Sequence, residues 1–505
     1  MHLTQGLTPL LALLGNLAVA DARRSSDAAA ELPPSRDPWY TLPAGADCTG
    51  SPGKVLRLRR APKSTRDSLR GIQDAWNVLF CSTDSLGLPT FSVTTVLVPR
   101  LADRASLATY APAYDSASVD SSPSFAFRDL PSASVEQALF APLLVAKRWV
   151  LNVPDYEGPR AAYLAGNNSG HGVLDSMRAV ASLRETIGLR EGYRQAVYGY
   201  SGGAFAAQWA AQLQPGYAPE LQVGAAAYGG LPVNATAAIQ SVNGGPSAGL
   251  VVLALLGTTA QDPAARAVLV DNLRKTGPFN ATTLLGAAAL DVKAGLALFK
   301  NQDIAEYFVD GFSFLRDPAF VRAFYDDTLA GHADTPTIPL YVFHAVKDEL
   351  SPSRDMDELV EKYCAAGARI RYRRNTVGDH TAEGVVEGIR ALNWLGRFFK
   401  ERTVDGGGGS CSQRCITQNV AVPLGPDTLA LVFAVFGQQG LSIARFLQAH
   451  PLPGIPPVPP TATNANIFAA LNLTSRAALT KIGLDDKRLA EFYVSDQDLA
   501  ELGIH

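Results

Sequence analysis

The sequence predicts an α/β fold with a largely parallel central sheet. Three observations support this prediction: short β-branched runs are typical of strands, other segments carry apolar residues at helical spacing, and the two kinds of segment alternate. Strands that are separated by helices pair in parallel, with the helices on the faces of the sheet. Strands are predicted at 91–98, 107–114, 149–153, 194–200, 222–227, 338–344 and 369–373. Helices are predicted at 172–186, 202–213, 353–366 and 381–400.

The residue types justify these elements in turn. Residues 91–98, FSVTTVLV, are rich in β-branched side chains and follow a turn at 85–87. The helix at 172–186 has its apolar residues at helical spacing, namely Val173, Leu174, Met177, Val180 and Leu183. Residues 194–200 form a strand that runs directly into the helix at 202–213.

Length and composition limit the class of protein. The chain has 505 residues, a length typical of about three domain-sized units or of one large domain with insertions. Its 47% apolar and 18% charged residues are typical of a globular chain, not of a disordered or fibrous one. The net charge of −3 provides no global positive field for nucleic acid. No apolar run reaches the roughly 20 residues that span a bilayer.

The N-terminus is predicted to be a secretory signal peptide, residues 1–20. Residues 7–20 are an apolar core, and Ala18-Val19-Ala20 provides the small-x-small pattern of a cleavage site. A buried first helix is the alternative. Four glycosylation sequons are consistent with export, at Asn167, Asn234, Asn280 and Asn472. We therefore expect a secreted, extracellular glycoprotein.

The cysteine count is odd, with Cys48, Cys81, Cys364, Cys411 and Cys415. In an oxidising compartment most of them should pair. The economical pairing joins Cys48 to Cys81, and Cys364 to Cys411 or Cys415, which leaves one thiol over. A zinc site at Cys411-x3-Cys415 would lack a nearby second pair of ligands.

Two regions interrupt the alternation of strands and helices. Residues 231–336 are rich in Ala, Gly and Leu and show helical periodicity without a clear strand, which predicts a helical insertion between core segments 38–230 and 337–402. Residues 403–505 begin with a Gly-rich linker. An apolar, helix-like stretch at 427–450 and a Pro-rich segment follow, and the last 45 residues are predicted to form short amphipathic helices without an assigned role.

The sequence Gly199-Tyr200-Ser201-Gly202-Gly203 carries the first sign of chemistry. It has the G-x-S-x-G pattern of a nucleophile elbow, with a strand directly before it and a helix directly after it. The serine of an elbow occupies a strained turn, so its flanking residues must be small. The strand–turn–helix context distinguishes this match from an ordinary Gly-rich turn.

A serine nucleophile needs a base, and in elbow enzymes the chain order is Ser, acid, His. His380 lies in a loop between the strand at 369–373 and the helix from 381, where an imidazole can reach the elbow. Structural roles are expected for His171, His332 and His344, whereas His450 opens a Pro-rich linker and His505 is the terminal residue.

The acid should follow the strand that precedes this base. Asp348 stands in the loop after the strand at 338–344, where its carboxylate can orient the imidazole and stabilise the imidazolium. Glu349 and Asp379 are rivals by proximity, with solvated surface carboxylates as the alternative for both.

Four motifs now carry a resemblance to a known family. They are Tyr200-Ser201-Gly202-Gly203, the run at 153–159 (VPDYEGP), the run at 217–221 (YAPEL) and the run at 229–233 (GGLPV). With them, residues 38–460 resemble the fungal secretory lipase family typified by Candida antarctica lipase A. The resemblance implies an α/β-hydrolase with an inserted helical cap and a C-terminal flap. It also implies hydrolysis of acylglycerols and other esters, with Ser201, Asp348 and His380 as the triad.

The oxyanion hole should use the backbone N–H of Gly202, the residue after the nucleophile. No HGGG motif supplies a second donor. The resemblance implies Asp115 instead, through its backbone N–H and a protonated side chain; an ordinary turn residue is the alternative.

The expected reaction needs no metal or organic cofactor. Ser201 attacks the ester carbonyl while His380 accepts its proton, and water later releases the acid. The expected partners are a lipid or ester substrate and, transiently, a lipid–water interface. An esterase or acyltransferase that acts on a small ester or secondary metabolite is the alternative function. A non-catalytic binding protein is disfavoured by the intact order Ser, Asp, His.

Overall fold

The computed structural model describes residues 31–69, 71–331, 334–401, 415–421, 475–481 and 496–501. Several predictions fall on other residues and so lie outside the described part of the chain. They are the signal peptide at 1–20, the Gly-rich linker, the stretches at 427–450 and 451–460, Cys411, Asn472, His332, His450 and His505.

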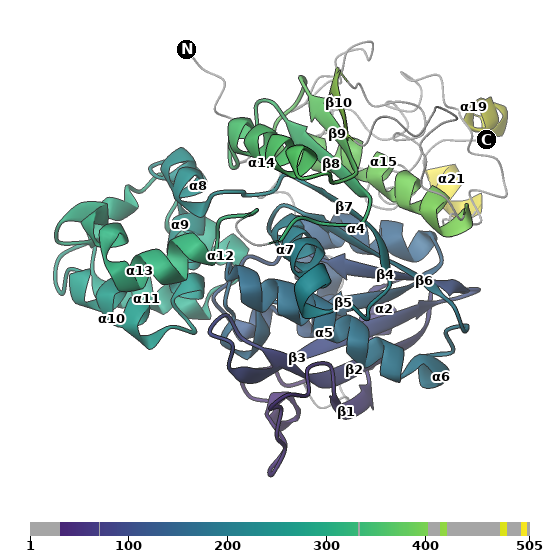
Figure 1. Cartoon of the computed structure of the whole chain (residues 1–505), viewed down its shortest axis with the longest axis horizontal. Coiled ribbons are helices and arrows are strands. Elements are labelled where there is room, and N and C mark those ends of the chain that lie inside the picture. The colour runs from purple at the N-terminus through teal and green to yellow at the C-terminus, as the bar shows by residue number, and fades with distance from the viewer. Residues whose placement is uncertain are drawn as a thin grey trace.

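A ten-stranded sheet forms the centre of the described structure (Figure 1). Its order is β1-β2-β3-β5-β4-β6-β7-β8-β9-β10. The strands β1, β2, β3 and β5 pair antiparallel with one another, and from β5 to β10 all pairs are parallel. The bounds are β1 Val55–Arg60, β2 Ile72–Thr83, β3 Pro89–Pro99, β4 Asp103–Ala111, β5 Trp149–Pro154, β6 Arg194–Tyr200, β7 Val223–Gly229, β8 Leu340–Ala345, β9 Ile370–Asn375 and β10 Cys415–Val420.

Helices cover both faces of this sheet, with α5, α7 and α14 on one face and α4 and α15 on the other. Alternate residues of β6 point into the two cores: Val197 packs with the first group and Tyr198 with the second. Strands that are buried on both faces consist of near-continuous apolar runs, as the central strands do here. The core helices are α2 Lys63–Ser68, α3 Pro123–Ala126, α4 Val135–Ala146, α5 Gly166–Ser182, α6 Arg184–Ile187, α7 Gly202–Tyr217, α14 Ser353–Ala365 and α15 His380–Lys400.

Between β7 and β8 the chain forms a separate group of helices, at the left of Figure 1. We call this group the cap; its bounds of 231–336 remain a prediction. Its helices are α8 Ala235–Val242, α9 Gly249–Thr258, α10 Pro263–Asn272, α11 Ala281–Gly286, α12 Val292–Leu298 and α13 Pro318–Val321, with shorter helical turns between them. Side-chain oxygens cap the first turns of five of these helices, from Asn234, Asp262, Asn280, Asp291 and Asp317.

The prediction of an α/β fold with a mostly parallel sheet is confirmed. All seven predicted strands and all four predicted helices are present, with end points that differ by a few residues. The sequence analysis did not assign β1, β2, β10 or α4. In the C-terminal segment the described helices are α19 Arg476–Lys481 and α21 Asp496–Glu501, and Leu499 of α21 is buried in the core beneath α15.

Two disulfides join Cys48 to Cys81 and Cys364 to Cys415. The predicted pairing is therefore confirmed, with Cys415 as the partner of Cys364. The first bond links the N-terminal segment to β2, and the second links α14 to the edge strand β10.

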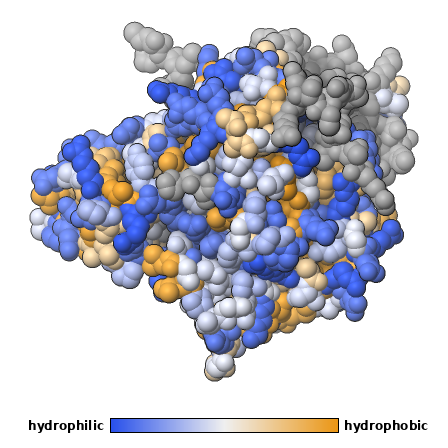
Figure 2. Space-filling view, in the orientation of Figure 1, coloured by the Kyte–Doolittle hydropathy of each residue, from blue (hydrophilic) through white to orange (hydrophobic). Residues whose placement is uncertain are grey.

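No described helix combines the length and the apolar character that crossing a bilayer requires. On the face in Figure 2, hydrophobic residues form several separate groups over the cap and the core. The large hydrophobic side chains that are exposed on the cap include Leu298, Val309 and Tyr325.

Candidate active site

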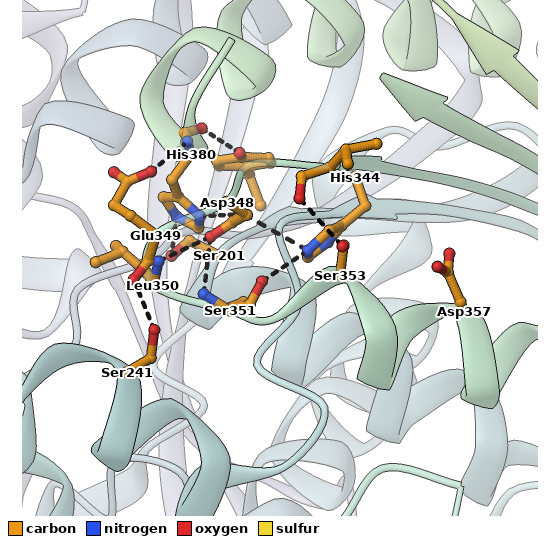
Figure 3. Close-up of polar contacts among 12 residues, drawn as sticks. Ser201, Ser241, His344, Asp348, Glu349, Leu350, Ser351, Ser353, Asp357 and His380 are labelled. Carbon is orange, nitrogen blue, oxygen red and sulfur yellow. Dashed lines mark hydrogen bonds and ion pairs between the residues drawn. The ribbon is translucent and has the colours of Figure 1, made fainter. Parts of the chain in front are cut away.

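Three side chains from three segments form a continuous hydrogen-bonded chain (Figure 3). Ser201 stands between β6 and α7, Asp348 follows β8, and His380 is the first residue of α15. The Nε2 atom of His380 is 2.9 Å from Ser201 Oγ, and its Nδ1 atom is 2.7 Å from Asp348 Oδ2. A proton on Nδ1 is held by the carboxylate, so Nε2 is free to accept the serine proton.

The turn at Ser201 has the strained backbone of an elbow. Ser201 adopts φ +56° and ψ −125°, a conformation that L-residues rarely adopt. Its neighbours must be small, because a Cβ on Gly199 would lie 2.1 Å from the carbonyl oxygen of Gly203, and a Cβ on Gly203 would lie 2.0 Å from that of Ala111. The glycines of the motif thus allow the close packing that exposes the serine.

The carboxylate of Asp348 is buried and held by backbone groups. Its Oδ1 atom accepts hydrogen bonds from the N–H groups of Leu350 at 3.0 Å and Ser351 at 2.8 Å. Burial acts to raise the pKa of Asp348, but the charge and hydrogen bond of His380 outweigh it, so the pKa lies below its usual value. Asp348 therefore stays ionised beside the imidazole.

A second histidine contributes to the same loop. His344 is fully buried, and its Nε2 atom lies 2.9 Å from the carbonyl oxygen of Ser351. This contact fixes the backbone that binds Asp348. The structural role expected for His344 is consistent with this position.

His380 is held at its backbone as well as at its ring. The hydroxyl of Tyr200 donates to the carbonyl oxygen of His380, and the carboxylate of Glu349 accepts from its N–H at 3.0 Å. Burial acts to lower the pKa of His380, but the neighbouring carboxylates, led by Asp348, raise it above its usual value. The contact from Tyr200 was not predicted from the sequence, although the residue stands inside the motif.

Asp115 lies against the first turn of α7. A Cβ atom on Gly202 would be 1.8 Å from Asp115 Oδ1, and this oxygen is buried without a hydrogen-bond partner among the described residues. Asp115 has φ +44°. Burial raises its pKa to about 7, against a smaller opposing effect of the charge on His380. A protonated Asp115 would be a hydrogen-bond donor aimed at the elbow.

The rival residues occupy other positions. Glu349 contacts the backbone of His380, and Asp379 accepts from the N–H of Ala382 as the N-cap of α15. Neither is the solvated surface carboxylate that was the alternative. His171 binds the carbonyl oxygen of Thr83 and stacks on Tyr217, with ring centroids 3.9 Å apart.

In the part of the chain that the structure describes, no group of three His, Cys, Asp or Glu side chains is placed to hold a metal ion. The arrangement brings together a hydroxyl, an imidazole and a buried carboxylate in one hydrogen-bonded chain, with a second buried carboxyl group beside the elbow. These are the components of acyl transfer by a serine hydrolase.

Comparison with known proteins gives a consistent result. The profile of the secretory lipase family matches residues 131–406. The chain is 38% identical to a trichothecene C-3 esterase from Fusarium sporotrichioides, over 80% of this chain and 92% of the relative. It is 34% identical to lipase A of Arthroderma benhamiae, over 75% of this chain and 82% of the relative.

Among solved structures, that of Candida antarctica lipase A superposes with a TM-score of 0.69 at 22% identity, over 81% of this chain and 97% of the other. This similarity establishes the α/β-hydrolase fold. The chain belongs to the secretory lipase family and is a carboxylic ester hydrolase.

Proposed function

We propose that this chain hydrolyses carboxylic esters through a covalent acyl-enzyme, with Ser201 as nucleophile, His380 as general base and Asp348 as the acid that orients it. One observation carries the proposal: the unbroken hydrogen-bonded chain from Asp348 through His380 to the strained Ser201. Each residue comes from a different segment of the chain, so the fold and not closeness in sequence brings the three side chains into contact.

The reaction proceeds in two halves. In the first, Ser201 Oγ bonds to the ester carbonyl carbon while His380 Nε2 takes its proton, and the imidazolium is stabilised by Asp348. The leaving alcohol departs with that proton, which leaves the acyl group on Ser201. In the second half, His380 takes a proton from water as the water oxygen bonds to the acyl carbon. The bond to Ser201 Oγ then breaks, His380 returns the proton to Ser201, and the acid is released.

The negative charge that develops on the carbonyl oxygen needs fixed donors. We assign the backbone N–H of Gly202, at the N-terminus of α7, as one donor. The second is Asp115, whose buried Oδ1 lies against Gly202 and has no hydrogen-bond partner within the described part of the chain. Its pKa, raised by burial to about 7, supports a protonated carboxyl that donates through O–H.

For the substrate we propose acylglycerols, in line with the family. The cap supports this choice, because its apolar helical group contacts the loops of the site: Ser241 of α8 donates to the carbonyl oxygen of Glu349, and Ser116 donates to that of Leu290. The proposed organisation is a core of 38–230 and 337–402, a cap of 231–336 and a C-terminal extension of 403–505. Transient contact with a lipid–water interface and export through a signal peptide at 1–20 belong to the same proposal.

A second candidate substrate is the ester of a small secondary metabolite. The observation that favours it is the 38% identity to the trichothecene C-3 esterase, against 34% for the lipase A relative. An acyltransferase would use the same acyl-enzyme, with an alcohol in place of water.

Substrate preference tests the two candidates. Hydrolysis rates are measured over a chain-length series of p-nitrophenyl esters, then on a triglyceride emulsion and on an acetylated trichothecene. The acylglycerol proposal predicts higher kcat/KM for long acyl chains and fatty-acid release from the emulsion. Turnover of the acetylated trichothecene with no release from the emulsion would replace it by the second candidate.

A further inference from the structure

The residue after the triad acid contacts the triad base directly. The side chain of Glu349 is half-buried, and its Oε2 atom accepts a hydrogen bond from the backbone N–H of His380 at 3.0 Å. Asp348, its neighbour, binds the ring of the same histidine at 2.7 Å. Two consecutive residues of one loop therefore hold His380 at two points, the side chain and the backbone (Figure 3).

The loop that carries Glu349 is itself anchored on three sides. Ser241 of the cap helix α8 donates to the carbonyl oxygen of Glu349 at 3.0 Å. The N–H groups of Leu350 and Ser351 bind Asp348, and His344 binds the carbonyl oxygen of Ser351. The Glu349 carboxylate therefore extends from a fixed backbone, and its hydrogen bond can hold the backbone of His380 in a fixed position relative to this loop.

We propose that Glu349 is a positioning residue for the reaction, which fixes the first residue of α15 so that the His380 ring meets Ser201 and Asp348 together. The inference rests on the proposed function of His380 as general base. Asp348 holds only the ring of His380 and Tyr200 holds only its carbonyl oxygen, whereas Glu349 fixes the backbone N–H next to the carbon from which the side chain starts. Misplacement by about 1 Å can cost a reaction about 100-fold in rate.

Charge and position act together here. The N–H of His380 is one of the donors at the start of α15 that find no partner within the helix itself. A carboxylate is favoured at this end by the helix dipole. Asp379 serves another of these donors, the N–H of Ala382 at 2.9 Å, from the N-cap position directly before the helix. Glu349 differs because it joins the helix to the loop of the triad acid.

Glu349 also belongs to the electrostatic surroundings of the base. Its negative charge, after that of Asp348, helps to raise the pKa of His380. Burial raises the pKa of Glu349 itself, and its contacts with His380 oppose this. The groups that face His380 from the packed elements are Asp348, Glu349, Asp115 and Tyr200, with Asp379 on its own helix.

The test compares Glu349→Gln, which keeps an acceptor oxygen but removes the charge, with Glu349→Leu, which removes both. Asp379→Asn is the matched control, because it neutralises a carboxylate at the same helix end that does not bind the N–H of His380. The readouts are kcat for a short p-nitrophenyl ester and the rate of Ser201 labelling by a fluorophosphonate, each followed from about pH 5 to about pH 10. Thermal unfolding checks that each variant is folded.

For Glu349→Gln we expect a rate on the high-pH plateau within about threefold of the wild-type rate. The midpoint of the pH profile, which reports the pKa of His380, should fall by about 0.5 pH unit or more because a negative charge has been removed. For Glu349→Leu the midpoint of the pH profile should also fall, and the rate on the high-pH plateau should fall about 10-fold or more because the contact with the N–H of His380 is lost. Asp379→Asn should shift the midpoint less than either Glu349 variant, because the carboxylates that chiefly raise the pKa of His380 are Asp348, Glu349 and Asp115. The inference is overturned if both Glu349 variants keep the midpoint and plateau of the wild type, or if Asp379→Asn reproduces their shift.

Failure of the proposed function and failure of the positioning role of Glu349 give different results. If the wild-type protein does not label at Ser201, the proposed function is wrong and the role of Glu349 is wrong with it. If the wild type labels normally with a pH-dependent rate and the Glu349 variants match it, only the positioning role is wrong.

Discussion

The Oδ1 atom of Asp115 occupies the space next to Gly202 so closely that a Cβ atom on residue 202 would lie 1.8 Å away. The glycine after the nucleophile is therefore required by the neighbouring carboxyl group as well as by the elbow. The two residues that we assign to the oxyanion hole are in mutual contact, and each limits the position of the other.

Gly202→Ala should reduce kcat/KM by at least about 100-fold, because the new methyl group displaces Asp115 from the elbow. The measurement is turnover of a short p-nitrophenyl ester, with thermal unfolding as a check on the fold. Gly286→Ala is the control, since a Cβ there meets nothing within 4 Å. Equal activity of Gly202→Ala and the wild type would contradict the contact.

Asp115→Asn should keep activity better than Asp115→Ala, because an amide N–H can replace a protonated carboxyl as donor. We expect a loss within about 10-fold for the amide and of about 100-fold or more for alanine. Equal activity of both variants would assign the donor role to the backbone N–H alone.

In the wild type, kcat/KM should rise with pH through a midpoint above the usual histidine value of about 6.5. The sign follows from the base: His380 must be neutral to accept the Ser201 proton, and its pKa is raised by its carboxylate neighbours against the effect of burial. A pH profile of kcat/KM with a stable, short ester measures the midpoint. A midpoint below 6.5 would mean that the carboxylates do not control the base.

His380→Ala should be as damaging as Ser201→Ala, and Asp348→Asn somewhat less so, because His380 moves the proton whereas Asp348 orients and supports it. Asp379→Asn should keep most of the activity, since its Oδ1 role as N-cap is one that asparagine can fill. The comparison uses kcat/KM of all variants on one ester. Loss of activity in Asp379→Asn with near-normal Asp348→Asn would mean that the triad acid is misplaced.

Arg373→Met should destabilise the fold by about 1–3 kcal/mol, because it removes the bidentate partner of the buried Glu387 carboxylate and leaves it only Arg390 and Tyr341. Arg373 binds both oxygens of Glu387, at 2.8 and 2.9 Å, and thereby joins β9 to α15, the helix that begins with His380. Urea unfolding measures the change. The control is Arg354→Met, whose exposed pair with Glu358 should be dispensable; equal effects of the two would contradict the burial argument.

The elbow and its partners could be predicted from sequence because local signals mark them. Ser201 stands in a short motif between a strand and a helix, and Asp348 and His380 each follow a strand that the residue types identify. These residues meet because the carboxyl ends of neighbouring parallel strands lie at one edge of the sheet. Asp115 needed the family resemblance, because it follows β4 without a local motif.

Other features depend on tertiary contacts that no local pattern records. The strand β10 adds to the sheet edge from beyond the linker, and the disulfide from Cys415 to Cys364 fixes it there. The backbone contacts of Glu349 and Tyr200 with His380 join residues that are far apart in the chain. The sequence analysis considered Glu349 only as a rival acid, since nothing local indicates a bond to a backbone N–H.

Labelling of the active site by a fluorophosphonate, followed by peptide mass spectrometry, tests the central claim most directly. The account predicts stoichiometric modification of Ser201, complete loss of labelling in Ser201→Ala, and a fall in ester turnover by several orders of magnitude in that variant, which should remain folded. Stoichiometric labelling at any other serine, or hydrolysis by Ser201→Ala at the wild-type rate, would contradict it.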